Sequence, residues 1–307
     1  MVVMNFVLMC LIFGTTFLGI KIGVDAGVPP FLSAGLRFFM AGLLLFGFMH
    51  WKEKTQLRLL FRKEVFLTGV CLTFGTFATL YWAEQYVTSG IAAVLSATGP
   101  MMILVIQTVI LKQKGNRLSF MGCLVGLIGV ALLILPSFSI KVSPFWMIGC
   151  FAILVGEVFY ATGAIYTKHV VQKFETTSPI ALNAAQMMHG GILLILLSLF
   201  TQDIQSDKLL SPASIGSLFY LTIVGSMIGH TIFYWLVSRT NPVFPSTWLY
   251  ISPLIAVILG VIFYDEYISW LTAIGTVTII AGTVLVNFKT LRELRLRKRA
   301  AFWDVKH

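Results

Sequence analysis

Long apolar segments separated by short polar loops run along the whole chain. Ten of these segments are about 20 residues long, the length that an α-helix needs to cross the hydrocarbon core of a bilayer. They lie near residues 3–22, 30–50, 65–87, 89–112, 118–136, 145–168, 178–200, 213–237, 243–264 and 269–288. The pattern predicts an all-α membrane protein with ten transmembrane helices.

The composition supports the same class of protein. Hydrophobic residues make up 58% of the chain and charged residues 11%, and the mean hydropathy is +0.90. A soluble domain carries roughly a quarter charged residues. The four cysteines, Cys10, Cys71, Cys123 and Cys150, all fall inside predicted spans and have no metal-ligand spacing. We therefore expect neither a metal site nor a cofactor.

The net charge of +10 is carried by loops and by the tail, residues 289–307. Eighteen of the 22 Lys and Arg residues lie in that tail and in one alternate set of loops, whereas the other set contains only Lys141 and Lys208. An excess of Lys and Arg marks cytoplasmic loops. We therefore expect a multi-pass protein of the cell membrane with both termini cytoplasmic. The partners expected are the lipid bilayer and a small-molecule substrate, and no nucleic acid.

Residues of the first half recur in the second half at nearly constant offsets. The pairs are Tyr81-Trp82 with Tyr234-Trp235, Pro100 with Pro253, Gly122 with Gly275 and Gly129 with Gly282 at 153, Arg37 with Gln186 at 149, and Lys21 with Lys168 at 147. Five spans is an odd number, so the second copy must enter the membrane from the opposite side. The sequence predicts an inverted repeat of two five-helix units, residues 1–137 and 145–288. Many secondary transporters have this architecture, and they bind substrate near the midplane of the membrane, between the two units.

A proline interrupts the middle of a span in each copy. Pro100 follows Ser96-Ala97-Thr98-Gly99, and Pro253 lies in the matching frame. Proline has no N–H to donate and displaces the carbonyl four residues back. Inside a bilayer such a break is tolerated where it packs on protein or lines a cavity. We predict hinges at Gly99, Pro100 and Pro253.

These motifs resemble the EamA-like family of the drug/metabolite transporter superfamily over nearly the whole chain. The residues that carry the resemblance are Phe13-Gly14-Thr15-Thr16-Phe17, Pro30 with Ala34-Gly35-Leu36-Arg37-Phe38, Glu84-Gln85-Tyr86-Val87-Thr88-Ser89-Gly90, Ser96 to Pro100, Ser252-Pro253 and Tyr264-Asp265-Glu266. The resemblance implies a ten-helix exporter or exchanger of amino acids and other small metabolites. It also implies a central cavity lined by spans seven and eight. In one departure, Asn241-Pro242-Val243 stands where the first copy has Thr88-Ser89-Gly90.

Glu157 is the foremost candidate for the transport site. It lies near the middle of the sixth span, on one helical face with Ala161, Ala164 and Lys168. Ionisable groups inside spans usually face the interior of the bundle and have a partner. A carboxyl at this depth suits a proton carrier or a ligand for a substrate ammonium group. The alternative is a protonated or paired structural glutamate.

Two cations and two histidines also lie inside spans. Lys21 and Arg37 lie towards the outer ends of spans one and two, where they would form a cationic lip for a carboxylate or phosphate. Alternatively, Lys21 reaches the interface and Arg37 clamps carbonyls or Glu84. His189 and His230 would relay protons or pack through hydrogen bonds.

Further polar and aromatic side chains are assigned to the substrate site. Asn183 and Gln186 share a face of span seven with His189. The other candidates are Ser96, His230 and four of the many aromatic residues around the proposed site, Tyr81, Tyr160, Tyr234 and Trp248. For each aromatic residue the alternative is helix packing or an interface belt.

The predicted function is a secondary transporter, not an enzyme, that exports small metabolites such as amino acids or related amphiphiles. No metalloprotease, nucleophile-elbow or P-loop spacing occurs in the sequence. Two alternatives remain open. One is an exchanger of phosphorylated or nucleotide-linked metabolites, and the other, of a different class, is a lipid flippase or a membrane interaction protein.

Overall fold

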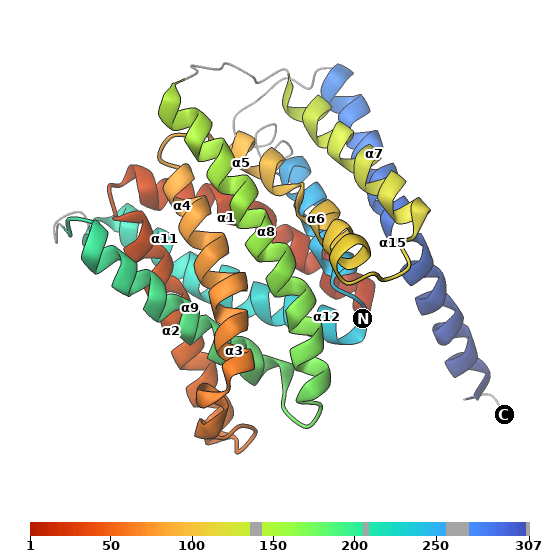
Figure 1. Ribbon diagram of the computed structural model, residues 1–307, viewed down its shortest axis with the longest axis horizontal. Coiled ribbons are helices and arrows are strands. Elements are labelled where there is room, and N and C mark those ends of the chain that lie inside the picture. Colours follow the sequence, from red (N-terminus) through yellow and green to blue (C-terminus); the bar gives the residue numbers. More distant parts are fainter. Residues whose placement is uncertain (136–142, 205–208, 256–269, 305–307) are drawn as a thin grey trace.

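The computed structural model describes residues 1–135, 143–204, 209–255 and 270–304 (Figure 1). Over these ranges the chain is all-α and contains no strand. The helices in chain order are α1 (Val2–Asp25), α2 (Pro30–Trp51), η1 (Leu57–Phe61), α3 (Lys63–Thr68), η2 (Gly69–Gly75), α4 (Thr76–Ala83), α5 (Ser89–Ser96), α6 (Gly99–Val105), η3 (Ile106–Ile110), α7 (Arg117–Ile134), α8 (Pro144–Lys173), α9 (Pro179–Thr201), α11 (Pro212–Tyr220), η5 (Leu221–His230), α12 (Thr231–Arg239), α13 (Val243–Ser246) and α15 (Trp270–Asp304).

Several of these elements join end to end into longer apolar helices. Among the described residues, eight helices are long and apolar enough to cross a membrane, and Arg117–Leu132 and Val243–Ile255 are shorter apolar helices. Three of the eight are composite, because η2, η3 and η5 are π-helical segments that continue a neighbouring α-helix. The all-α prediction is confirmed, and the end of the predicted ninth span lies outside the described residues, as does the motif Tyr264-Asp265-Glu266.

Proline and serine define where the helices begin. Proline occupies the first helical position of α2, α8, α9 and α11, where its missing N–H has no intrahelical partner to lose. The hydroxyls of Ser143, Ser178 and Ser211 accept backbone N–H groups of the first turn. The second half therefore starts three of its helices with the same Ser-Pro pair.

Helices from the two halves pack against each other. α2 packs on α9 and α7 packs on α15, and the second pair runs along one edge of the bundle (Figure 1). α1 contacts α11, η5 and α12, while α8 contacts α3, η2, α4 and α6. Glycines permit the closest approaches. A Cβ on Gly42 would lie 2.7 Å from the carbonyl oxygen of Ala184, and one on Gly282 would lie 2.3 Å from the backbone nitrogen of Gly126.

The predicted break in the first half is confirmed. α5 ends at Ser96, α6 begins at Gly99, and Pro100 lies in the first turn of α6, where it removes no intrahelical hydrogen bond.

The prediction of a break in the matching frame of the second half is wrong. The chain is helical at residues 248–255 around Pro253, and the turn lies earlier, at Thr247. At this turn Ser246 donates to the carbonyl of Pro242 and Thr247 donates to that of Phe244, each at 2.7 Å. Such bonds compete with the helical ladder.

Candidate functional site

A small cavity lies where helices of both halves meet. Its walls come from α1, α2, η2, α4, α5, α8, η5, α12 and the helical stretch at residues 248–255. The cavity volume is about 40 Å³, which is room for about three water molecules. Apolar and aromatic side chains form most of the lining, and a few ionisable and polar groups converge on it. A solute larger than a few waters therefore needs the helices to move apart.

Glu157 lies in this lining and is 5% exposed. Its Oε2 atom has no hydrogen-bond partner in the part of the chain that the structure describes, and Ser96 lies beside the carboxyl group. A Cβ on Gly99 would lie 2.5 Å from that oxygen. The absence of a side chain at Gly99 thus makes the space that the carboxyl group occupies at the break between α5 and α6.

Arg37 reaches the cavity from α2 and is 1% exposed. Its Nε atom donates to Ser226 Oγ at 2.7 Å, and Nη1 donates to Tyr81 OH at 3.2 Å. The guanidinium also lies 4.7 Å from the ring centroid of Phe38 and 5.4 Å from that of Phe77. The predicted alternative of a bond to Glu84 does not occur among the described contacts, and neither does a carboxylate partner.

His230 faces the cavity from the end of η5, within a cluster of rings. Phe13 and Phe38 meet it edge-on, with ring centroids 5.1 and 5.4 Å away, and Phe77 lies at 5.9 Å. The Nδ1 atom of His230 is buried and has no hydrogen-bond partner among the described residues.

Tyr160 and Trp248 join α8 to the second half of the lining. Trp248 Nε1 donates to Tyr160 OH at 3.3 Å, and Tyr160 donates to Ser246 Oγ at 3.0 Å. Trp248 also packs on Phe13, with ring centroids 4.6 Å apart. This chain of hydrogen bonds fixes the two aromatic rings that form one wall.

Other predicted site residues lie in packing networks outside the described lining. Thr73 donates to Gln186 Oε1 at 2.7 Å, and Gln186 donates to Asn183 Oδ1 at 3.2 Å. Tyr234 OH accepts a hydrogen bond from Thr167 at 3.5 Å, and Tyr81 OH accepts the hydrogen bond from Arg37 described above.

Lys21 and His189 also lie apart from the cavity. Lys21 pairs with Asp25 at 2.8 Å and donates to the carbonyl of Glu84 at 3.4 Å. His189 Nε2, in the middle of α9, lies 2.9 Å from the carbonyl oxygen of Leu60 in η1. The structure thus separates Lys21 from Arg37, which alone of the predicted cationic lip contributes to the described lining.

The sequence did not single out several lining residues. Phe13, Thr16 and Phe17 line the cavity from α1, and Thr76 and Phe77 line it from α4. The four-residue spacing of Phe13 and Phe17 places both on one face of α1, and both belong to the motif that carries the family resemblance. The shared helix face and the shared motif together were the sequence features that could have identified Phe13 and Phe17 as lining residues.

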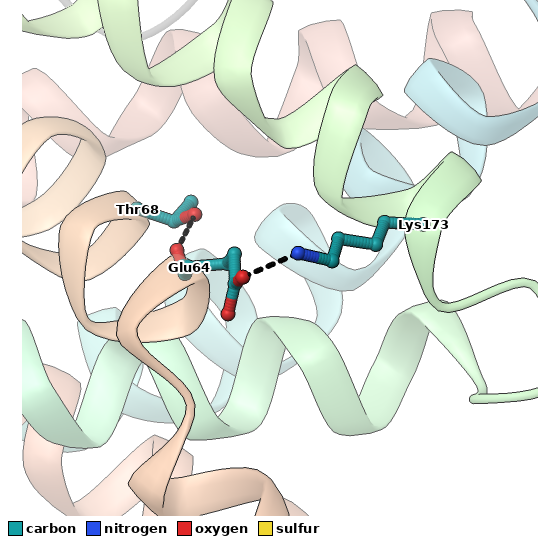
Figure 2. Close-up of polar contacts among 3 residues, drawn as sticks. All are labelled: Glu64, Thr68 and Lys173. Atoms are coloured by element: carbon teal, nitrogen blue, oxygen red, sulfur yellow. Dashed lines mark hydrogen bonds and ion pairs between the residues drawn. The ribbon is translucent and has the colours of Figure 1, made fainter.

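An ion pair joins the two halves near one end of the bundle. Lys173, at the end of α8, donates to Glu64 Oε1 at 2.6 Å, and Thr68 donates to the backbone carbonyl of Glu64 at 2.8 Å (Figure 2). The side chain of Glu64 is 9% exposed and that of Lys173 is 50% exposed. This contact links the start of α3 to α8.

Comparisons with known proteins agree with this picture. The model of the EamA-like transporter family matches residues 1–135 and 147–288. The chain is 29% identical to the uncharacterized inner membrane transporter YedA of Escherichia coli K12 over 90% of this chain and 87% of YedA. It is 24% identical to the uncharacterized transporter YoaV of Bacillus subtilis over 94% and 97% of the two chains.

A solved crystal structure has the same fold, with a TM-score of 0.73 and 16% identity over 94% of this chain and 97% of the other. The family match spans most of the sequence, and the described helices include eight long enough to cross a membrane. The resemblance seen in the sequence motifs is confirmed: the chain is a multi-pass membrane protein and belongs to the EamA-like transporter family.

Proposed function

We propose that this protein is a secondary transporter that exports small metabolites, such as amino acids or related amphiphiles, across the cytoplasmic membrane by alternating access. The observation that carries the proposal is the small cavity between the halves, which Glu157, Arg37 and aromatic side chains line. Because the cavity has room for only about three water molecules, a larger solute binds there only if the helices move apart.

Matched contacts support the inverted repeat that this mechanism needs. Arg37 bonds Ser226 at 2.7 Å, and Gln186 bonds Thr73 at 2.7 Å. Arg37 and Gln186 are 149 residues apart, and Thr73 and Ser226 are 153 apart, as the sequence offsets require. Thr73 lies in η2 and Ser226 in η5, so both partners belong to π-helical segments. The two bonds are one contact made twice with the halves exchanged.

The lysines supply a second matched pair. Lys21 donates to the carbonyl of Glu84 at 3.4 Å, and Lys168 donates to that of Val237 at 3.1 Å. Glu84 and Val237 are again 153 residues apart. Each bond ties the first helix of a half to the end of its third. These contacts support two five-helix units, and the basic loops support cytoplasmic termini.

The lining favours a solute with both charged and apolar parts. Glu157 suits a substrate ammonium group or a transported proton, and Arg37 suits a carboxylate. Aromatic walls add apolar contact. Arg37 is the one cation among the described lining residues, whereas a doubly charged phosphate ester calls for several. The amino-acid class is therefore favoured over phosphorylated metabolites.

Counterflow in proteoliposomes tests the proposal. The purified protein is preloaded with unlabelled amino acids, and entry of labelled amino acid is measured with and without a pH gradient. We expect counterflow that the gradient accelerates, and Glu157→Gln should abolish the acceleration. Glu175→Gln, the same change at an exposed loop position, is the control.

The outcomes separate the parts of the proposal. Counterflow that is unchanged by the pH gradient and by Glu157→Gln would contradict proton coupling, and the protein would then be a facilitator. No counterflow of any amino acid, together with counterflow of phosphate esters, would overturn the substrate class. Lipid scrambling without solute transport would overturn the proposal in favour of a flippase.

A further inference from the structure

A second hollow lies far from the central cavity, between the loop that follows α2 and the loop that follows α8. Both loops lie at the lower end of the bundle in Figure 1, next to the Glu64–Lys173 ion pair of Figure 2. The hollow has a volume of about 380 Å³. Residues of the first half, from Glu53 to Arg62, form most of its wall, and Phe174, Thr176 and Thr177 of the second half complete it.

The lining is strongly cationic. Lys54, Arg58 and Arg62 all contribute to it, and each is exposed. Among the described residues none of the three has an acidic partner, since the ion pairs found there are Lys21–Asp25 and Lys173–Glu64. Glu53 is the one carboxylate in the described lining, which therefore carries a net charge of +2. Three neighbouring cations repel one another unless an anion lies between them.

Thr55 gives this hollow a buried polar group as well. It is 8% exposed, it lines the hollow, and its Oγ1 atom has no hydrogen-bond partner within the described ranges. Its backbone carbonyl lies 3.1 Å from His50 Nδ1, so the residue itself is held in place. A buried hydroxyl without a partner destabilises the fold, and a ligand that accepts its hydrogen bond would relieve this.

The end of α2 fixes the position of this hydroxyl. Lys54 N donates to the carbonyl of Met49, and Glu53 N donates to that of His50, each at 2.9 Å. These two bonds form a Schellman motif, in which Glu53 takes the left-handed position with φ 57°. The turn reverses the chain directly before Thr55. The backbone, and not only the flexible side chains, therefore shapes the wall.

We propose that this hollow is a binding site for a phosphate group, carried by an anionic phospholipid headgroup or by a free phosphate. Two arginines offer the forked donors that match phosphate oxygens. The lysine adds charge, and the hydroxyls of Thr55, Thr176 and Thr177 supply further donors. Because its walls come from both halves, a bound phosphate bridges them beside the Glu64–Lys173 pair. Its binding can be measured without any transport assay.

The test uses the full-length protein in a neutral detergent. Thermal unfolding is followed in inorganic phosphate and in sodium chloride of equal ionic strength, and native mass spectrometry counts bound phosphatidylglycerol against phosphatidylcholine. The variant Arg58→Gln/Arg62→Gln removes two lining charges. Lys112→Gln/Lys114→Gln makes the same charge change in another exposed basic loop. Thr55→Val removes the buried hydroxyl without breaking any bond within the described protein.

We expect phosphate or phosphatidylglycerol to stabilise the wild type and the Lys112→Gln/Lys114→Gln control equally. Binding should weaken roughly tenfold in Thr55→Val, which is the loss of one charge-assisted hydrogen bond, and more in Arg58→Gln/Arg62→Gln. Glu53→Gln should tighten it. Stabilisation by inorganic phosphate would identify a free phosphate as a ligand, and retention of phosphatidylglycerol alone would identify the lipid. No binding of either, or equal loss in the control, would overturn the site.

Discussion

Arg37 and Gln186 have corresponding positions in the two halves but different surroundings. Each bonds a hydroxyl on a π-helical segment of the opposite half at 2.7 Å. Arg37 then faces the cavity and lies over two phenylalanine rings. Gln186 instead bonds Asn183 and lies within packed helices. The hydrogen bond between the helices occurs in both halves, whereas only the first-half residue of this pair carries a charge and lines the cavity.

The scaffold part of this comparison predicts equal and large effects from Gly42→Val and Gly191→Val. A Cβ on Gly42 would lie 2.7 Å from the Ala184 carbonyl oxygen, and one on Gly191 would lie 2.5 Å from the Phe39 nitrogen. Overpacking against backbone costs about 1–3 kcal/mol and occasionally more. We expect both variants to lower the midpoint of thermal unfolding in detergent by similar amounts.

The control is Gly47→Ala on the same helix as Gly42. A Cβ there would meet nothing within 4 Å. Alanine raises helix propensity by up to about 1 kcal/mol, so this variant should be neutral or stabilising. If Gly42→Val proved harmful and Gly191→Val harmless, the two sides of the α2–α9 contact would not be equivalent.

The site part of the comparison predicts unequal effects from Arg37→Gln and Gln186→Leu. Arg37→Gln copies the other half, so the fold should persist, but solute counterflow should fall by tenfold or more because a charged hydrogen bond of about 1.5–3 kcal/mol is lost. Gln186→Leu leaves Thr73 and Asn183 without their partner and should cost about 1–3 kcal/mol of stability. Transport per folded molecule should stay near the wild-type rate. Normal counterflow in Arg37→Gln would make Arg37 a structural residue.

Arg37 and Gln186 also show which features of the structure could be predicted from the sequence and which could not. Hydropathy and the recurring offsets predicted the helices, because the bilayer imposes span length on every transmembrane segment. Polarity inside a span predicted Arg37, Glu157 and His230, which line the cavity. The same criterion also selected Asn183 and Gln186, which bond one another and a neighbouring helix, because a polar residue inside a span needs a partner of either kind.

The break near Pro253 and the aromatic walls were less predictable. At the turn at Thr247 hydroxyls bond two nearby carbonyls, but the same kind of bond occurs inside the uninterrupted helices α8 and α15, so serine and threonine in the sequence do not locate the turn. Phe13 and Phe77 look like any other apolar residue of a span until the packing of the helices shows which face meets the cavity.

A smaller effect is expected from exchanging Gly99 and Ser252, which are 153 residues apart. A side chain on Gly99 would displace the Glu157 carboxyl, whose Oε2 is 2.5 Å from the Cβ position. Gly99→Ser should therefore lower counterflow several-fold while costing little stability, because a carboxyl at the end of a flexible side chain can move away. Ser252→Gly removes a buried hydroxyl that has no partner among the described residues, so its counterflow should be unchanged. Equal losses in the two variants would show that the space for Glu157 is not the reason for the loss at Gly99.

The smallest effects are expected at the matched lysines, Lys21 and Lys168. Lys168 donates to the carbonyls of Val237 and Ser238 at 3.1 and 3.2 Å, and Lys168→Met should cost about 1–2 kcal/mol because hydrogen bonds to a charged donor are lost. Lys21 makes a longer hydrogen bond to the carbonyl of Glu84 and an ion pair with Asp25. The side chain of Lys21 is 30% exposed and that of Asp25 is 59% exposed. Exposed pairs contribute about 0–1 kcal/mol, so Lys21→Met should matter less. Thermal unfolding at low and high salt separates the two, because salt screens the exposed pair and leaves the carbonyl bonds of Lys168 in place. A salt-independent loss of the same size at both positions would mean that the carbonyl bond, common to the two halves, is the whole role of either lysine.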